Sequence, residues 1–207
     1  GMSQEAPALV VTPIHTQRFI GGSGIVAGHA AGLGAKVYYM SVSGNDDMRD
    51  FAYGELQRFG LDTTLLGDDT RPTTLKQRFR ADGITLLGVS HLHQGAIDVN
   101  LQDQFLERFE AVVPDCQLVV FSDFNYGCLP QPLVERLIEI GRARGVLMAA
   151  DSQSSSQIGN VSRFKGMHLL TPTEHEARVS LRNHEDGLVV LAEKLKDESR
   201  AKNILLK

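Results

Sequence analysis

Tryptophan is absent from this 207-residue chain, cysteine occurs only twice, and no long apolar run is present. Cys116 and Cys128 lie twelve positions apart without a Cys-x-x-Cys or Cys/His spacing, which favours free thiols over a disulfide or a zinc site. No segment reaches the roughly 20 apolar residues that cross a bilayer. The formal net charge is −4 and no basic cluster occurs, which argues against nucleic acid as a partner. These absences predict a cytoplasmic protein that binds neither a membrane nor nucleic acid.

Short apolar runs alternate with helical patterns along the chain. With 42% hydrophobic and 22% charged residues, the composition is that of a soluble globular domain, or most of one. The alternation predicts an α/β fold in which a mostly parallel sheet lies between helices and binds ligands at the carboxyl ends of its strands. The expected strands are 36–42, 117–121, 146–150, 168–171 and 203–206, and the expected helices are 24–33, 47–59, 101–113, 130–143, 173–181 and 185–199.

A glycine cluster at Gly21, Gly22, Ser23 and Gly24 opens directly into a helix of small residues. Backbone N–H groups at such a helix start suit an oxygen-rich or anionic ligand. The cluster and Ala27 also fit a relaxed dinucleotide fingerprint, so an NAD-dependent oxidoreductase is one alternative. That alternative lacks its usual acidic residue about 20 positions later, where this chain has serine. A structural alternative is that the glycines only allow the helix to pack closely on a sheet.

Two pairs of half-polar segments interrupt the α/β pattern. We expect each pair to form antiparallel strands, because polar and apolar residues alternate in them and the second pair is joined at Asp82-Gly83. Together they would make a small sheet beside the main body that acts as a lid or an oligomer contact. The expected strands are 8–12, 17–20, 73–80 and 84–90, within lid segments of about 8–20 and 72–92.

Several short motifs follow one another in a consistent order along nearly the whole chain. They are Ser3-x-Glu5-Ala6-Pro7, Gly21-Gly22-Ser23-Gly24 with Leu33-Gly34-Ala35, Gly44-x-Asp46-Asp47, Pro72-Thr73-Thr74-x-Lys76-x-Arg78, Ser122-Asp123-Phe124-x-x-Gly127, Asp151 and Thr171-Pro172-Thr173-x-x-Glu176. In this order they resemble a ribokinase-like (PfkB) carbohydrate kinase, and most closely the kinase domain of bifunctional ADP-heptose synthase-type proteins. The resemblance implies a ribokinase-like three-layer α/β sandwich with a small β-sheet lid. It also implies ATP-dependent phosphorylation of a sugar or sugar phosphate.

The resemblance implies roles for individual residues as well. The substrate-binding set is Gly21, Gly22, Ser23, Gly24, Lys76, Arg78, Asp123 and Asn125. The set on the ATP side is Asp151, Gln153, Thr173 and Glu176, of which Glu176 would hold Mg²⁺ through water. A homodimer through the lid and a fused nucleotidyltransferase domain are the implied partners.

Structural alternatives remain open for these side chains. Lys76 and Arg78 share one strand face, which would point at the ligand, at solvent or at a lid partner. Asp123 would either accept a hydrogen bond from a substrate hydroxyl or close an Asx-turn. Thr173 and Glu176 have the spacing of a capping box at a helix start, and the two roles are compatible.

Parts of the family pattern are missing or altered. No acidic strand motif precedes Ser3, and no Gly-Ala-Gly-Asp segment, which would supply the catalytic Asp, occurs up to Lys207. We therefore expect residues 1–207 to be a partial kinase domain, inactive alone, with its catalytic base beyond Lys207. Tyr126 stands where a lysine is usual, and Ser152 with Gln153 replaces Pro-Lys after Asp151. A catalytically silent sugar- or nucleotide-binding or dimerisation module is the remaining alternative.

Overall fold

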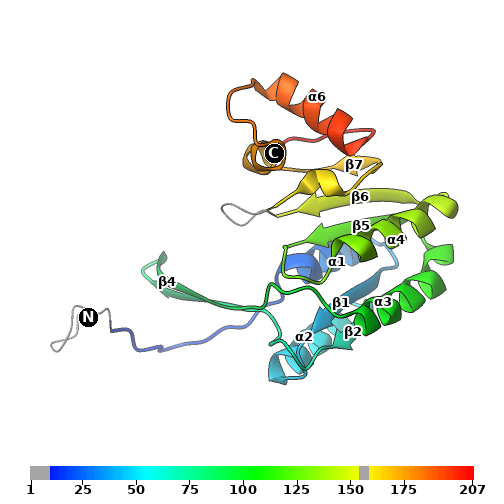
Figure 1. Cartoon of the computed structure of the whole chain (residues 1–207). Coiled ribbons are helices and arrows are strands. Elements are labelled where there is room, and N and C mark those ends of the chain that lie inside the picture. Colours follow the sequence, from blue (N-terminus) through cyan, green and yellow to red (C-terminus); the bar gives the residue numbers. More distant parts are fainter. Residues whose placement is uncertain (1–9, 154–158) are drawn as a thin grey trace.

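The computed structural model of the chain describes residues 10–153 and 159–207. Helices and strands alternate along it (Figure 1). The helices are α1 (Gly22–Gly32), α2 (Asp47–Arg58), α3 (Val99–Val112), α4 (Gln131–Ala143), α5 (Glu174–Leu181) and α6 (Leu188–Ser199), with short 3-10 turns at η1 (Val113–Asp115) and η2 (Val161–Arg163). The strands are β1 (Tyr38–Ser43), β2 (Asp62–Gly67), β3 (Leu75–Ala81), β4 (Ile84–His91), β5 (Leu118–Asp123), β6 (Leu147–Ser152) and β7 (Leu169–Leu170).

The strands of the described residues form two parallel sheets and one antiparallel hairpin. β1 pairs with β2, and β5, β6 and β7 form a second parallel sheet. Leu170 of β7 also makes a parallel bridge to Ile204, so the last predicted strand adds to this sheet only briefly. Parallel strands joined by helices confirm the predicted α/β fold.

Strand β2 is not predicted from the sequence. It begins at Asp62, continues with two threonines and ends at Gly67, so it lacks the continuous apolar run of a strand buried on both faces. In the structure it pairs with β1 from Tyr38 opposite Asp62 to Ser43 opposite Gly67. The hydrogen bonds to β1 make this segment a strand, and the local sequence pattern does not predict them.

Apolar side chains form two buried clusters. The larger one lies where α3, α4 and α6 cover β5 and β6, and it includes Phe105, Phe109, Leu133, Leu137, Met148, Phe164, Leu191 and Leu195. The smaller one joins α1 and α2 to the β1–β2 pair through Ala27, Leu56 and Leu61. The helix positions recur at spacings of three or four residues, which is the pattern of a helix with one buried face.

The hairpin of β3 and β4 confirms the second predicted pair of strands. Asp82 and Gly83 form its two-residue turn with φ angles of 50° and 80°. Two successive left-handed residues match the right-handed twist of a hairpin, which explains the Asp-Gly sequence. Figure 1 shows that the hairpin projects from the body of the molecule.

The first predicted pair of lid strands is wrong for the described part of residues 8–20. Residues 10–20 form an extended segment without strand pairing, while residues 8 and 9 lie outside the described residues. Ile14 and Phe19 in this segment are 99% and 77% exposed. Alternating polarity alone does not make a strand, because a two-stranded unit is marginal unless it packs on further strands or a hydrophobic layer. The segment runs out on the same side as the hairpin (Figure 1).

Candidate functional site

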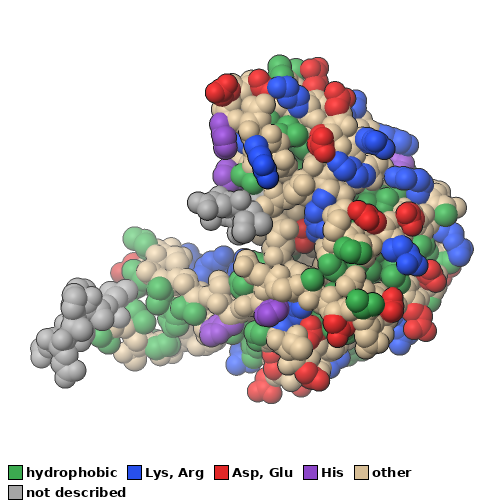
Figure 2. All heavy atoms as spheres, in the orientation of Figure 1, with side chains coloured by type: hydrophobic (Ala, Val, Ile, Leu, Met, Phe, Trp, Pro, Cys, Tyr) green, Lys and Arg blue, Asp and Glu red, His purple; other side chains and the backbone are tan. Residues whose placement is uncertain are grey.

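A large cavity of about 2060 Å³ lies between the two parallel sheets and beneath the hairpin. It is lined from β1, β5, α1 and β3, and the space-filling view shows a hollow beside the projecting arm (Figure 2). Parallel strands of an α/β fold commonly bind ligands beyond their carboxyl ends. The predicted site residues that line this cavity are Gly21, Gly22, Ser23, Gly24, Lys76, Arg78, Asp123 and Gln153.

The glycine cluster forms the start of α1, as the sequence predicts. Gly21 is the N-cap residue, and Gly22 has a φ of 53°, which a residue with a side chain rarely adopts. A Cβ atom at Gly22 would lie 3.3 Å from the Phe124 ring, whereas one at Gly24 would lie 2.7 Å from Ile20. Gly24 therefore serves packing, while Gly21 and Gly22 leave the helix start open to the cavity.

The hydroxyl of Ser23 points toward the sheet. Its Oγ shares a hydrogen bond of 2.8 Å with the phenolic oxygen of Tyr39 on β1. Burial raises the pKa of Tyr39, although the Ser23 hydrogen bond opposes the rise. Tyr39 therefore stays neutral at physiological pH, and the bond fixes α1 against β1.

Asp123 at the end of β5 is buried, with both carboxylate oxygens engaged inside the protein. Oδ1 accepts a hydrogen bond of 3.0 Å from the Asn125 backbone N–H. Oδ2 accepts bonds from the Ser152 hydroxyl at 3.0 Å and from Arg163 Nη2 at 2.8 Å. The geometry is an Asx-turn reinforced by a buried ion pair, which matches the structural alternative for this residue.

Asn125 connects the loop after β5 to the end of β6. Its φ of 57° is left-handed, and its side-chain amide donates to the Gln153 carbonyl at 2.7 Å. The Gln153 backbone N–H donates in turn to the Asp123 carbonyl at 2.8 Å. The Asn125 side chain is thus bound to the protein itself, and this residue is not among those that line the cavity.

Lys76 on β3 reaches back toward the body of the molecule. Its Nζ lies 5.2 Å from the centroid of the Tyr126 ring, within the range of a cation–π interaction. Tyr126 is half-buried in the loop after β5, so this contact joins the hairpin to that loop. Arg78 is exposed on the same strand and also lines the cavity.

The predicted ATP-side residues gather at the ends of β6 and β7. Asp151 Oδ1 accepts bonds from Thr171 Oγ1 at 3.2 Å and from Lys207 Nζ at 3.0 Å. Thr173 and Glu176 form the predicted capping box of α5, in which the Thr173 N–H donates to Glu176 Oε2 at 2.8 Å. Of the ATP-side set only Gln153 lines the large cavity, so the structure does not bring the two predicted sets into one cavity.

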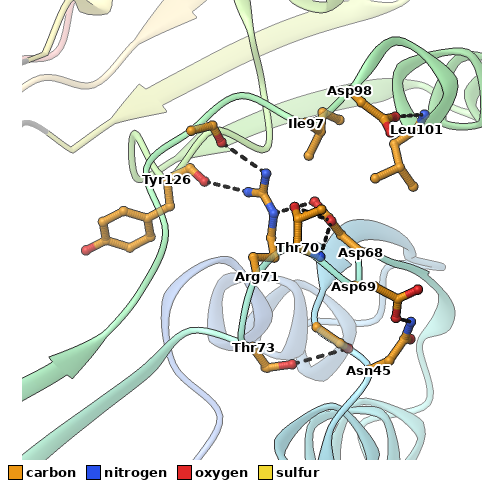
Figure 3. A network of polar contacts seen from close by, with 12 residues as sticks. Asn45, Asp68, Asp69, Thr70, Arg71, Thr73, Ile97, Asp98, Leu101 and Tyr126 are labelled. Atoms are coloured by element: carbon orange, nitrogen blue, oxygen red, sulfur yellow. Dashed lines mark hydrogen bonds and ion pairs between the residues drawn. The ribbon is translucent and has the colours of Figure 1, made fainter.

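A further polar network lies where the chain enters the hairpin, and sequence reasoning does not find it. Arg71 Nε forms a 2.6 Å ion pair with Asp68, and both side chains are buried. Arg71 also donates to the carbonyls of Tyr126 and Gly95, each at 3.0 Å (Figure 3). Burial raises the pKa of Asp68, but the hydrogen bonds from Thr70 and Arg71 outweigh it and lower the pKa.

Neither Arg71 nor Arg163 carries a sequence signal that separates it from a surface arginine. Arg71 directly precedes the Pro72-Thr73-Thr74 motif, which is the one hint available. Arg163 lies in η2, forty positions from Asp123, and its role depends wholly on the fold.

The described residues contain no group of three or more His, Cys, Asp or Glu side chains that could hold a metal ion. The described residues also include no helix that is long and apolar enough to span a membrane.

The α/β fold of the chain matches solved structures of PfkB-type kinases. Residues 2–207 match the pfkB family carbohydrate kinase, and the chain belongs to that family. The assignment confirms the resemblance derived from the motif order and sets aside the NAD-dependent oxidoreductase, because the family is one of kinases.

Individual proteins add detail to this assignment. The chain is 33% identical over 178 residues to the bifunctional protein HldE of Desulfatibacillum aliphaticivorans, covering 85% of this chain and 35% of that protein. The tetrameric inhibited form of phosphofructokinase-2 from Escherichia coli matches with a TM-score of 0.70 at 16% identity, over 94% of this chain and 66% of that one. The same enzyme in complex with fructose-6-phosphate matches with a TM-score of 0.66 at 16% identity, over 90% and 61%. The chain thus spans about a third of the length of this curated relative. The solved structures support the fold.

Proposed function

We propose that this chain forms the sugar-binding part of an ATP-dependent kinase for a sugar or sugar phosphate. The observation that carries the proposal is the cavity between the two parallel sheets, because its lining includes the start of α1, Lys76 and Arg78 of the hairpin, and the carboxyl ends of β1 and β5. Backbone N–H groups at a helix start and two cations favour a ligand with hydroxyl and phosphate oxygens. The phosphofructokinase-2 complex with fructose-6-phosphate supports a sugar phosphate as the first ligand to test.

The residues divide into binding and positioning roles. Gly21, Gly22 and Ser23 line the cavity at the start of α1, and Lys76 and Arg78 bind an anionic group of the substrate. Asp123 is a positioning residue, because its carboxylate holds the Asn125 turn and pairs with Arg163. This role replaces the expected contact of Asp123 with a substrate hydroxyl, and Gly24 and Asn125 act through packing and loop geometry.

Asp151, Gln153, Thr173 and Glu176 form the ATP side of the proposal. ATP with Mg²⁺ supplies the phosphoryl group and the charge that neutralises it during transfer. The capping box fixes the start of α5. From this position Glu176 would contact the ion through water. The proton-accepting Asp of the reaction is proposed to lie outside these 207 residues, because the sequence contains no Gly-Ala-Gly-Asp segment.

A binding experiment tests the proposal directly. Isothermal titration of the 207-residue chain with fructose 6-phosphate, glucose 6-phosphate and MgATP should show saturable binding of a sugar phosphate. A chain that binds MgATP but no sugar would make this a nucleotide-binding module, and one that binds neither would favour a dimerisation module.

We also propose a homodimer through the β3–β4 hairpin. Ile84, Leu86 and Leu87 of β4 are 67%, 44% and 47% exposed, and apolar side chains gather on the projecting arm (Figure 2). A second copy would cover these side chains and the outer hairpin edge. The HldE relative is bifunctional, which supports a fused nucleotidyltransferase in a longer form of the protein.

A further inference from the structure

Two aromatic rings follow β5 at the wall of the cavity. Phe124 and Tyr126 lie with their centroids 6.3 Å apart and their planes at 27°, in a stacked arrangement. Asn125 lies between these two residues and has a left-handed φ of 57°. This turn brings the two rings next to each other. Both rings belong to residues that line the cavity.

The rings lie between the two parts of the proposed sugar site. On one side, the Phe124 ring packs so closely on Gly22 that a Cβ atom there would approach within 3.3 Å. On the other side, the Lys76 ammonium lies 5.2 Å from the Tyr126 centroid. A ligand between the start of α1 and the hairpin would therefore rest against aromatic surface.

The backbone of this aromatic turn is held firmly from behind. Arg71 donates to the Tyr126 carbonyl, and its buried ion pair with Asp68 fixes the guanidinium in place. Figure 3 shows the Tyr126 side chain pointing away from Arg71. Gly127 packs against the Gly95 carbonyl so tightly that a Cβ atom there would collide with it. The Tyr126 ring is thus presented to the cavity by a loop that has little freedom to withdraw.

We propose that Phe124 and Tyr126 form a floor for the C–H face of a sugar ring, and that Tyr126 holds the Lys76 ammonium ready for an anionic substituent of that sugar. This inference rests on the proposed function and specifies its substrate as a sugar ring with an apolar face and one phosphate or carboxylate group. Sugar C–H groups pack well on aromatic faces, and these rings are large and rigid. A charge-assisted hydrogen bond to an anion is stronger than an exposed cation–π contact. The Lys76 ammonium would therefore leave the Tyr126 ring and bind the anionic group of the substrate.

The chain offers a matched control for this cation–π contact. Lys36 Nζ lies 4.7 Å from the Tyr38 ring at the amino end of β1. Both residues line the same cavity, but at the opposite end of the strand from the proposed site, which lies beyond the carboxyl ends of β1 and β5. Lys36→Ala removes the same kind of interaction with the same kind of ring. It should leave ligand binding unchanged.

The experiment measures dissociation constants of the 207-residue chain for four probes, namely fructose 6-phosphate, inorganic phosphate, glucuronate and fructose. Calorimetry is the readout for every variant, because replacing Tyr126 removes one of the four tyrosines that would report binding by fluorescence. The variants are Tyr126→Leu, Tyr126→Phe, Lys76→Ala and Lys36→Ala, each checked for unchanged thermal unfolding.

Tyr126→Leu should weaken binding of the sugar probes by about tenfold, whereas Tyr126→Phe, which keeps the ring, should change it less than about twofold. Lys76→Ala should weaken the anionic sugars by about ten- to a hundredfold and leave fructose nearly unchanged. A stronger effect on fructose 6-phosphate than on glucuronate identifies the anion as phosphate, and the reverse identifies a carboxylate.

Other outcomes overturn the inference. If Tyr126→Leu leaves sugar binding unchanged, the aromatic floor is wrong although the proposed function stands. If Lys76→Ala weakens fructose and its phosphate equally, the lysine serves hairpin folding and does not recognise an anion. If the unaltered chain binds inorganic phosphate and no sugar, the sugar site fails along with the proposed function.

Discussion

Two arginines hold the loops around the cavity, and each does so by pairing with a buried carboxylate. Arg71 pairs with Asp68 and reaches the loop after β5, while Arg163 pairs with Asp123 and also donates to the Leu129 carbonyl at 2.9 Å. A guanidinium with five donors can satisfy several carbonyls at once, which an ammonium cannot do in this planar geometry. At the scale of single residues, Arg71 and Arg163 therefore fix the loops that surround the cavity.

The Arg163 pair predicts a large change in stability. Arg163→Met should lower the free energy of unfolding by about 3 kcal/mol, because it leaves the Asp123 carboxylate buried without its cation. Urea unfolding followed by circular dichroism measures this change. Lys165→Met, which removes an exposed pair with Glu198, is the matched control and should have no measurable effect.

A double variant separates loss of the pair from loss of packing. Adding Asp123→Asn to Arg163→Met removes the buried charge and should recover part of the lost stability. If the double variant is as unstable as the sum of the two single variants, charge pairing is not the cause.

The Asp68 pair predicts a dependence of stability on acid. The folded pKa of Asp68 is lower than its ordinary value of 3.8, so its stabilising contribution is complete above that value and is lost as the pH falls through the lower folded pKa. Asp68→Asn should therefore destabilise the chain at neutral pH, and the difference from the unaltered protein should shrink below about pH 4. Thermal unfolding between pH 2.5 and 7 measures the difference, and one that stays constant over this range would contradict the prediction.

At the scale of elements, the hairpin is the part of the fold most exposed to another molecule. β3 and β4 pair only with each other among the described strands, so the backbone groups on their outer edges face outward. The base of the hairpin is nevertheless fixed, because the Thr73 N–H donates to Asp46 at 2.8 Å. Burial opposes ionisation of Asp46, but this bond and others from Thr73 and Arg49 lower its pKa. The hairpin thus combines an anchored base with an exposed apolar arm.

The exposed arm predicts a change in oligomeric state. Ile84→Lys should convert the proposed homodimer to a monomer, because it places a charge in the covered apolar face. Light scattering at tens of micromolar measures the mass. Val189→Lys in α6 changes an aliphatic side chain of similar exposure, 73% compared with 67% for Ile84, and should leave the mass unchanged. A monomeric unaltered chain, or an equal effect of both variants, would exclude dimerisation through the hairpin.

At the scale of the whole molecule, the two parallel sheets face one cavity without pairing to each other. β1 and β5 each have one partner strand among the described residues, and both line the cavity. Leu118 and Val120 on β5 are 53% and 51% exposed, which is unusual for a strand of a parallel sheet. The strand edges of β1 and β5 that face the cavity are therefore left without a partner strand among the described residues.

This arrangement predicts the activity of the chain. The 207 residues should show no sugar-dependent release of ADP above background, because proton removal and substrate positioning are not supplied together. A coupled assay for ADP with the sugars that bind measures this. A longer form that includes a Gly-x-Gly-Asp segment should be active. Turnover by the 207-residue chain would contradict the assignment of the base to residues beyond it.

Much of the fold was determined by the sequence alone. The apolar runs of β1, β5 and β6, the helical patterns between them and the Asp82-Gly83 turn all appear where periodicity and turn chemistry place them, because each depends on neighbours close in the chain. The motif order likewise determined the family. The capping box at Thr173 and Glu176 is equally local, since its donors and acceptors lie three positions apart.

Only the tertiary structure decided the contents of the site. Pairing with β1 makes β2 a strand, and the described residues 10–20 stay unpaired although their sequence alternates in polarity. Arg163 forms an ion pair with the carboxylate of Asp123. Arg71 donates a hydrogen bond to the Tyr126 carbonyl, and the Tyr126 ring contacts the Lys76 ammonium. Arg163 and Asp123 are 40 positions apart in the sequence, and Arg71 and Tyr126 are 55 positions apart. The energy of these contacts comes from burial and from exclusion of water, which exist only after the chain has folded.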